Sequence, residues 1–174
     1  LADAALVTDQ FGNPVEGFAV SWAASAGSVD PATSTTDADG QAATQRTLGP
    51  SAGTQSATAT AEGLQGSPIT FNQVATAGSA SSLVKVSGDN QSGSAGAPLD
   101  QPLVVRLTDG DGNPIAGSPV SWVVGVGGGS VAPSGDTGPD GAASAVFTLG
   151  PTAGATNTVN AVVSGVGVVV FTAT

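Results

Sequence analysis

The stretch that decides the fold is Leu107-Thr108-Asp109-Gly110-Asp111-Gly112-Asn113-Pro114-Ile115-Ala116-Gly117, because the chain contains it twice. The earlier copy reads Val7-Thr8-Asp9-Gln10-Phe11-Gly12-Asn13-Pro14-Val15-Glu16-Gly17, so the copies are 107 − 7 = 100 residues apart. Val20-Ser21-Trp22 returns at the same spacing as Val120-Ser121-Trp122. Self-similarity at a fixed spacing is the signature of a repeat architecture. The sequence therefore predicts two copies of one structural unit.

The repeat extends over nearly the whole chain. The further matches are Gly27-Ser28-Val29 with Gly129-Ser130-Val131, Asp39-Gly40 with Asp140-Gly141, Leu48-Gly49-Pro50 with Leu149-Gly150-Pro151, and Phe71 with Phe171. Differences in length fall in Gly-rich segments, where loops tolerate them. We expect one domain in residues 1–76 and a second in residues 77–174. The short linker Thr76–Ala80 between them restricts their relative angles.

Hydrophobic residues alternate with a period of two inside each copy. Leu103, Val105 and Leu107 share one face of a predicted strand, and Val159 and Val163 repeat the pattern later. The chain has 26 Gly and 11 Pro, which helices tolerate poorly. Short alternating runs between turn residues are typical of an antiparallel sandwich or barrel, so the fold class is predicted to be all-β.

The ordered set of motifs resembles a known family. Asp-x-x-Gly-Asn-Pro, Val-Ser-Trp, Asp-Gly-x-Ala and Leu-Gly-Pro-x-Ala-Gly follow one another in both copies. This pattern is similar to the bacterial immunoglobulin-like (Ig-like) repeat domains of the invasin and intimin type. The resemblance implies two tandem Ig-like β-sandwich domains of seven to nine strands in an extracellular or cell-surface bacterial protein. It also implies a stalk or spacer without catalytic residues, with adhesion carried by other domains.

The two copies differ in length before the Asp-x-x-Gly-Asn-Pro turn. The second copy carries Ser82–Ser87, then a Gly-rich bend, then Pro102–Thr108, whereas the first has only Leu1–Thr8. We therefore expect residues 1–76 to be an N-terminally truncated repeat that lacks the first strand, and residues 77–174 to be a complete one. The missing strand would come from the rest of a longer chain or from a neighbouring molecule.

The charge disfavours several classes of partner. Thirteen acidic and three basic residues give a net charge of −10, which repels nucleic acid and anionic membrane surfaces. The most apolar run, Val168–Phe171, is too short to span a bilayer, so no membrane insertion is expected in this segment. Most acidic residues lie in Gly-containing turns, which predicts solvated loops. The acidity is interpreted as a source of solubility and mutual repulsion between chains.

Asp109, Asp111 and Asn113 are the only candidates for a metal site. Their alternating spacing is that of a calcium loop, but no distal Glu follows in this copy, and the first copy has Phe11 in the middle position. Gly permits a positive φ, and Asp and Asn bond to their own backbone, so a structural turn is favoured over a calcium site. No other cofactor is expected.

An enzymatic function is disfavoured. The chain has no Cys and no His, so it lacks the usual nucleophile and base, and the best zinc ligands. Lys85, the only Lys, has no counterpart in the first copy, so a Lys–Asn crosslink cannot be general to the repeat. Trp22 and Trp122 recur in register with alternating apolar residues, which predicts core positions rather than a glycan-binding platform.

Three classes of function remain open. The leading hypothesis is a non-catalytic structural repeat module of a bacterial extracellular fibre, stalk or adhesin, whose partners are neighbouring Ig-like repeats in the same or adjacent chains. The first alternative is a filament subunit that forms a homopolymer by strand complementation between chains. The second alternative is a glycan- or receptor-binding adhesin domain, or a phage-virion decoration.

Overall fold

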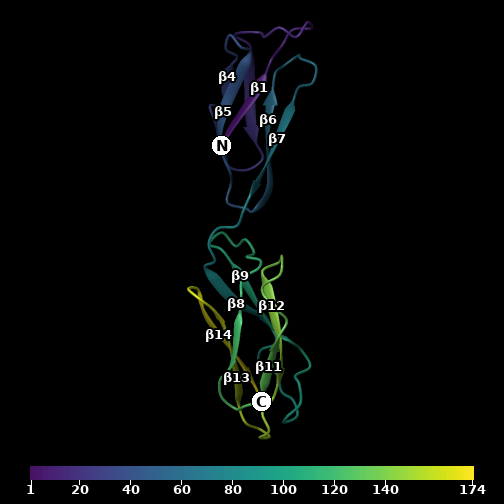
Figure 1. Ribbon diagram of the computed structural model, residues 1–174, viewed down its shortest axis with the longest axis vertical. Coiled ribbons are helices and arrows are strands. Elements are labelled where there is room, and N and C mark those ends of the chain that lie inside the picture. Colours follow the sequence, from purple (N-terminus) through teal and green to yellow (C-terminus); the bar gives the residue numbers. More distant parts are fainter. The chain divides into compact units, whose positions relative to one another are not determined.

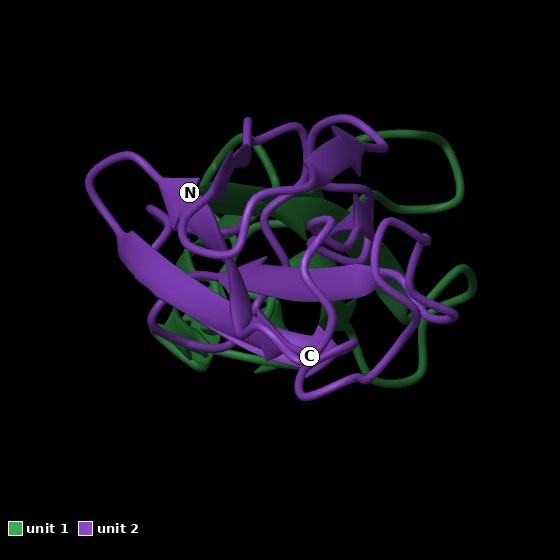
Figure 2. Ribbon diagram, turned by 90° about the horizontal axis from the view of Figure 1, so that it is seen from below, with its two compact units in different colours: residues 1–76 green, residues 77–174 purple.

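The computed structural model describes residues 1–174 and contains fourteen β-strands and no helical element (Figure 1). Every pair of strands is antiparallel. The all-β prediction is therefore confirmed. No helix has the length and apolar character needed to cross a bilayer. The chain divides into two compact units, Leu1–Thr76 and Ala77–Thr174 (Figure 2), which we call unit 1 and unit 2.

Unit 1 consists of two sheets. Its strands are β1 (Ala2–Leu6), β2 (Ala19–Ala24), β3 (Ser28–Asp30), β4 (Thr33–Thr35), β5 (Gln41–Thr47), β6 (Gly53–Thr60) and β7 (Ile69–Ala75). One sheet has the order β1-β5-β3, and the other has the order β4-β2-β6-β7. The turn with the repeated Asp-x-x-Gly-Asn-Pro motif lies between β1 and β2, where the chain passes from one sheet to the other.

Unit 2 has a similar arrangement of two sheets, with different strands at their edges. Its strands are β8 (Ser82–Ser87), β9 (Leu103–Thr108), β10 (Ser121–Val124), β11 (Ser130–Pro133), β12 (Ala142–Thr148), β13 (Asn157–Val163) and β14 (Gly167–Ala173). The sheets have the orders β11-β12-β9-β8 and β10-β13-β14. Because β9 precedes the repeated turn and pairs with β12, it corresponds to β1, which pairs with β5. β8 has no counterpart among the strands of unit 1, so β1 forms the edge of its sheet.

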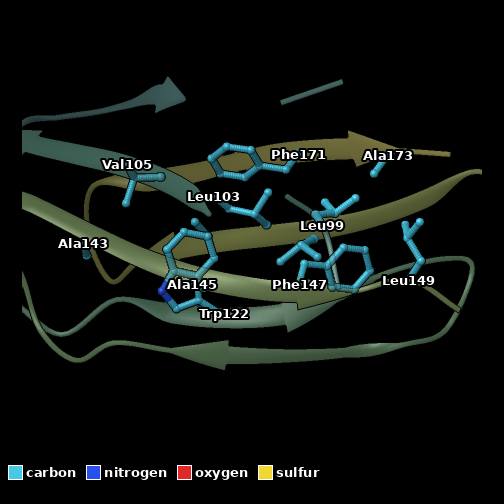
Figure 3. Close-up of a cluster of buried hydrophobic side chains, with 12 residues drawn as sticks. Leu99, Leu103, Val105, Trp122, Ala143, Ala145, Phe147, Leu149, Phe171 and Ala173 are labelled. Carbon is cyan, nitrogen blue, oxygen red and sulfur yellow. The ribbon is translucent and has the colours of Figure 1, made fainter. Parts of the chain in front are cut away.

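The core of unit 2 lies between the inward faces of the two sheets (Figure 3). Leu103, Val105 and Leu107 are at most 1% exposed, as their alternation predicts. Trp122 packs against Phe171 with 5.9 Å between the ring centroids. Offset or tilted aromatic pairs at this distance contribute stability beyond the area that they bury.

The core of unit 1 contains smaller side chains. Trp22 packs against Phe71, again with 5.9 Å between the ring centroids, and its Nε1 donates a hydrogen bond to Ser34 Oγ at 2.8 Å. Around this pair the buried apolar residues are mainly Ala and Val: Ala5, Val7, Val20, Ala42 and Ala59. The prediction that both tryptophans belong to the core is confirmed, since Trp22 is 4% and Trp122 is 9% exposed.

Two of the repeated glycines are required by close backbone approach. Gly27 has φ +74°, and a Cβ there would lie 2.0 Å from the carbonyl oxygen of Thr47. Gly129 has φ +90°, and a Cβ there would lie 2.1 Å from the carbonyl oxygen of Thr148. Both positions therefore accept only glycine, which explains why Gly-Ser-Val occurs at the start of β3 and of β11.

Replacing Trp122 by Ala should lower the free energy of unfolding of unit 2 by about 3–5 kcal/mol, because it removes a large buried ring and leaves a cavity. The measurement is urea denaturation of the full chain, followed by far-UV circular dichroism. The control is Val123→Ala on the same strand, where the side chain is 52% exposed and a loss of at most about 0.5 kcal/mol is expected. Equal effects of the two substitutions would contradict the core position.

Candidate functional site

The carboxylate of Asp109 organises the turn that the sequence marks as a calcium candidate. Its Oδ1 accepts the backbone N–H of Asp111 at 3.0 Å and that of Asn113 at 2.8 Å. Its Oδ2 accepts the side-chain amide of Asn113 at 2.8 Å. The Asp109 N–H in turn donates to the carbonyl oxygen of Asn113 at 3.0 Å. Asp109 and Asn113 thus bond to each other and close the turn, while Asp111 is exposed.

These hydrogen bonds stabilise the ionised carboxylate. Donation from the Asn113 side chain, followed by the backbone N–H groups, lowers the pKa of Asp109 to about 2. A calcium ion at Asp109 would have to displace these donors. The structure also contains no group of three or more His, Cys, Asp or Glu that could hold a metal ion. That the turn is structural, rather than a calcium site at Asp109, Asp111 and Asn113, stays a prediction.

Asp109 has a further partner that the sequence analysis missed. Its Oδ2 also accepts the backbone N–H of Gly78 at 2.8 Å, from the segment that leads into β8. Ser81 then donates its N–H to the carbonyl oxygen of Thr108 at 2.9 Å. The turn therefore fastens the incoming linker to unit 2. No local sequence pattern predicts a contact between residues that are 31 positions apart.

In the matching turn of unit 1, the Asp9 carboxylate accepts hydrogen bonds from groups of the same turn. Asp9 Oδ1 accepts the N–H groups of Phe11 at 2.8 Å and of Asn13 at 2.9 Å, and Oδ2 accepts the Asn13 side chain at 2.9 Å. The Asn13 side chain is the main cause of a lowered pKa at Asp9 as well. Phe11, which replaces the middle carboxylate, is 80% exposed.

The remaining acidic turns are also structural. Asp37 Oδ1 accepts the N–H groups of Asp39 and Gln41, and Asp140 Oδ1 accepts the N–H of Ala142. These carboxylates cap backbone within their own loops, which agrees with their predicted place in turns.

The prediction of solvated acids is wrong for Asp3, which lies in β1 and is 4% exposed. Gln73 on β7 joins it to Arg46 on β5, which is 2% exposed: Gln73 Nε2 donates to Asp3 Oδ1 at 2.6 Å, and Arg46 Nη1 donates to Gln73 Oε1. Asp3 Oδ2 and the Nε and Nη2 of Arg46 are buried without a hydrogen-bond partner. Unit 1 therefore contains a buried Asp–Gln–Arg network inside its sandwich.

Unit 2 has an apolar set at the same three positions. Asp3 corresponds to Leu103 by the 100-residue offset, and Gln73 corresponds to Ala173. Arg46 corresponds to Phe147, since Val29 pairs with Arg46 and the matching Val131 pairs with Phe147. Leu103, Phe147 and Ala173 are all labelled among the core side chains in Figure 3. The difference is visible in the aligned copies, where Asp3 and Gln73 stand at the positions of Leu103 and Ala173.

A cavity opens beside β1 in unit 1. It has a volume of about 400 Å³, and its lining residues include Ala5, Val7, Asp9, Val20, Ala59 and Ile69, with Leu64 and Ser67 from the loop before β7. Its walls combine apolar side chains with polar groups from the Asp9 turn and from the loop before β7. Asp9 is the one acidic residue among the lining residues, so the cavity does not bring together the pair of carboxylates that acid–base chemistry would use.

Comparison with known families identifies the domain. Residues 4–74 match the model of the bacterial Ig-like domain (group 1). The match lies within unit 1, and the resemblance inferred from the repeated motifs is confirmed. No curated protein matches the sequence.

Solved structures extend the comparison to both units. The chain is similar over 99% of its length to InvD of Yersinia pseudotuberculosis, with 16% identity and a TM-score of 0.66. It is also similar over 99% to FdeC, described as an Escherichia coli adhesin, with 20% identity and a TM-score of 0.51. Invasin, described as a bacterial integrin-binding protein, has 25% identity over 99% of the chain and a TM-score of 0.46.

The chain spans only part of these proteins: 51% of the InvD chain, 59% of the FdeC chain and 35% of the invasin chain. The two similarities with TM-scores above 0.5 show the fold. Both units are Ig-like β-sandwiches, as predicted.

Replacing Asp109 by Asn should reduce the dependence of stability on acid pH. The pKa of Asp109 is lowered from 3.8 to about 2, so its ionised form stabilises the fold above about pH 4, and this contribution is lost as the pH falls through about 2. Thermal melting at intervals between about pH 5 and pH 2 measures the effect. The variant should melt at a lower temperature near pH 5 and should lose less stability on acidification than the native chain. An unchanged pH profile would contradict the role of this carboxylate.

Removing one member of the buried network of unit 1 should cost more than removing all three. Asp3→Leu alone leaves the Arg46 guanidinium buried without its carboxylate and should destabilise unit 1 by about 3–5 kcal/mol. The triple change Asp3→Leu, Arg46→Phe and Gln73→Ala, which restores the apolar set of unit 2, should be neutral or stabilising by about 1–4 kcal/mol. Urea denaturation monitored by Trp22 fluorescence, in a Trp122→Phe background, separates these outcomes. A triple variant less stable than the single one would refute this account.

Proposed function

We propose that this chain is a non-catalytic structural module of a bacterial extracellular or cell-surface protein, and that it acts as a spacer in a row of Ig-like repeats. The observation that carries the proposal is the short connection between the units, which is hydrogen-bonded to unit 2 almost from its start. β7 ends at Ala75, and Gly78 is already hydrogen-bonded to Asp109 in unit 2. Only Thr76 and Ala77 lie between them. A connection with so few unattached residues restricts bending between repeats, which a spacer requires.

The chemistry of the surface supports a role without catalysis. The chain has neither His nor Cys, and the carboxylates of Asp9, Asp37, Asp109 and Asp140 each accept hydrogen bonds from their own turns. The pKa values of Asp9 and Asp109 are lowered, which is opposite to the direction that a general acid needs. The net charge of −10 suits a module that remains in solution without sideways association.

The relatives support the same assignment in outline. Residues 4–74 match the bacterial Ig-like domain (group 1), and FdeC, which shares the fold, is described as an adhesin. Neighbouring Ig-like repeats are the partners that this function requires. Each repeat needs a preceding and a following module to transmit position along the row.

Spin-label distance measurements test the spacer function. The chain has no Cys, so Ser21→Cys and Ser121→Cys, at equivalent exposed positions on β2 and at the start of β10, accept labels without interference. A spacer should give a narrow distribution of distances between the two labels. A control chain with a short run of glycines inserted after Thr76 should give a broad one. If the native chain is as broad as this control, the spacer function has to be abandoned.

A further inference from the structure

Several buried polar side chains make the same contact in both units. Thr36 Oγ1 and Thr137 Oγ1 each donate to a backbone carbonyl oxygen in the segment that follows the repeated Asn-Pro. Gln55 Oε1 and Asn157 Oδ1 each accept a backbone N–H from the repeated Leu-Gly-Pro. All four side chains are buried. These contacts therefore belong to the common framework of the repeat.

The buried Asp–Gln–Arg network differs from these contacts, because only unit 1 contains it. In and just after β1, Ala5 and Val7 are buried and apolar like the inward residues of β9, so Asp3 alone differs in polarity. Buried charges contribute little net stability, so the fold does not need the network in order to be stable. What the network does supply is a chemical difference between two otherwise similar cores.

The network joins the beginning, the middle and the end of unit 1. Asp3 lies on β1, Arg46 on β5 and Gln73 on β7, so the three side chains come from both sheets. The hydrogen bond from Gln73 Nε2 to Asp3 Oδ1 connects residues that are 70 positions apart. Consider a hybrid sandwich, in which unit 1 supplies the strands up to some point and unit 2 supplies the rest. Wherever that point falls between Asp3 and Gln73, the hybrid lacks at least one member of the network.

Both kinds of hybrid would contain a buried charge without its partner. If β1 paired with β12, Asp3 would lie opposite Ala145 in the place of Leu103, inside an apolar core. If β9 paired with β5, Leu103 would lie opposite Thr44, and Arg46 would be buried without a carboxylate in its network. An uncompensated buried charge of this kind should lower the population of the hybrid by at least about a hundredfold.

We propose that the Asp3–Gln73–Arg46 network prevents the strands of unit 1 and unit 2 from assembling into hybrid sandwiches, within one chain or between two. Exchange of equivalent strands between neighbours is a characteristic way in which repeat proteins misassemble. Because one core requires a polar set and the other an apolar set, each core accepts strands of its own kind and rejects those of the other. The network thus contributes specificity of strand pairing rather than net stability.

Two introduced thiols detect a hybrid sandwich, since the chain itself has no Cys. Ala4 lies opposite Ala43 where β1 pairs with β5, and Ser144 has the place of Ala43 in unit 2. After Ala4→Cys and Ser144→Cys, the two thiols become cross-strand neighbours when β1 pairs with β12. The full chain is unfolded in urea, refolded and only then oxidised. Mass spectrometry measures the disulfide between these two positions, and a sample oxidised without unfolding gives the background.

Three chains that carry these thiols are compared. The chain with the native network should form no more hybrid disulfide than the background. The triple change Asp3→Leu, Arg46→Phe and Gln73→Ala should raise the hybrid disulfide at least about tenfold, because both cores then accept the same strands. The matched control is Val20→Ala, which removes buried apolar volume from unit 1 but keeps the network. It should stay at the level of the native network.

A fourth chain separates the difference between the cores from the identity of their residues. It combines the triple change in unit 1 with Leu103→Asp, Phe147→Arg and Ala173→Gln, so that the polar and apolar sets exchange places. The cores again differ, and the hybrid disulfide should fall back to the level of the native network. Near-UV circular dichroism verifies that both units of this chain are folded.

Three results would overturn the proposal. Equal amounts of hybrid disulfide from the chain with the native network and the chain with the triple change would do so alone. A similar rise in the Val20→Ala chain would mean that hybrids form whenever unit 1 loses stability. A folded fourth chain that forms as much hybrid disulfide as the triple variant would mean that a difference between the cores does not direct pairing.

Discussion

The hydrogen-bonded carboxylate at the Asp-x-x-Gly-Asn-Pro turn is the constraint on which the rest of this structure depends. The turn lies where the chain leaves one sheet and enters the other, so its shape determines how β1 and β9 are placed relative to β2 and β10. Asp109 satisfies the N–H groups of Asp111 and Asn113 within the turn and also that of Gly78 in the linker. One buried side chain thus connects the turn, the linker and the start of β8. Because a buried carboxylate needs such donors, the turn and the linker stabilise one another.

The two units stabilise the same fold in different ways. Unit 2 fills its core with Leu103, Phe147 and Phe171 and covers one sheet edge with β8. Unit 1 has a smaller, Ala-rich core, and places Asp3 and Arg46 where unit 2 has Leu and Phe. Buried charges contribute little net stability, because their desolvation offsets their attraction. They do penalise wrong registers, since a one-residue slip of β1 would turn Asp3 to the other face of the sheet and leave Arg46 buried without a carboxylate in its network. Unit 1 thus relies on polar contacts to hold its edge strand in register.

Much of this fold could be predicted from the sequence, because the period-two pattern and the repeat are local signals. The alternation of Leu103, Val105 and Leu107 identified the buried face of β9, and the recurrence of Trp22 as Trp122 identified core positions. The Asp109 turn was also predictable from its residue types. Its bond to Gly78 was not, because it joins residues that only the folded chain brings together. Arg46 shows how far the pattern reaches: the alternation of Ala42, Thr44 and Arg46 puts all three on the inward face of β5, whatever their charge. Where pattern and polarity disagreed, the pattern was the better guide.

The linker and the sheet edge are the same segment in unit 2, and this has a consequence for how such repeats assemble. Gly78 and Ser81 belong to the connection from unit 1, yet they bond to Asp109 and Thr108, and β8 continues from them to cover the edge of β9. An exposed strand edge invites aggregation, and a separate device normally blocks it. Here the connection to the previous repeat is itself the block. A repeat of this kind therefore protects the edge of its sheet only when a segment occupies the position of Gly78–Ser87. The segment that connects two repeats is thus also the one that completes the sandwich.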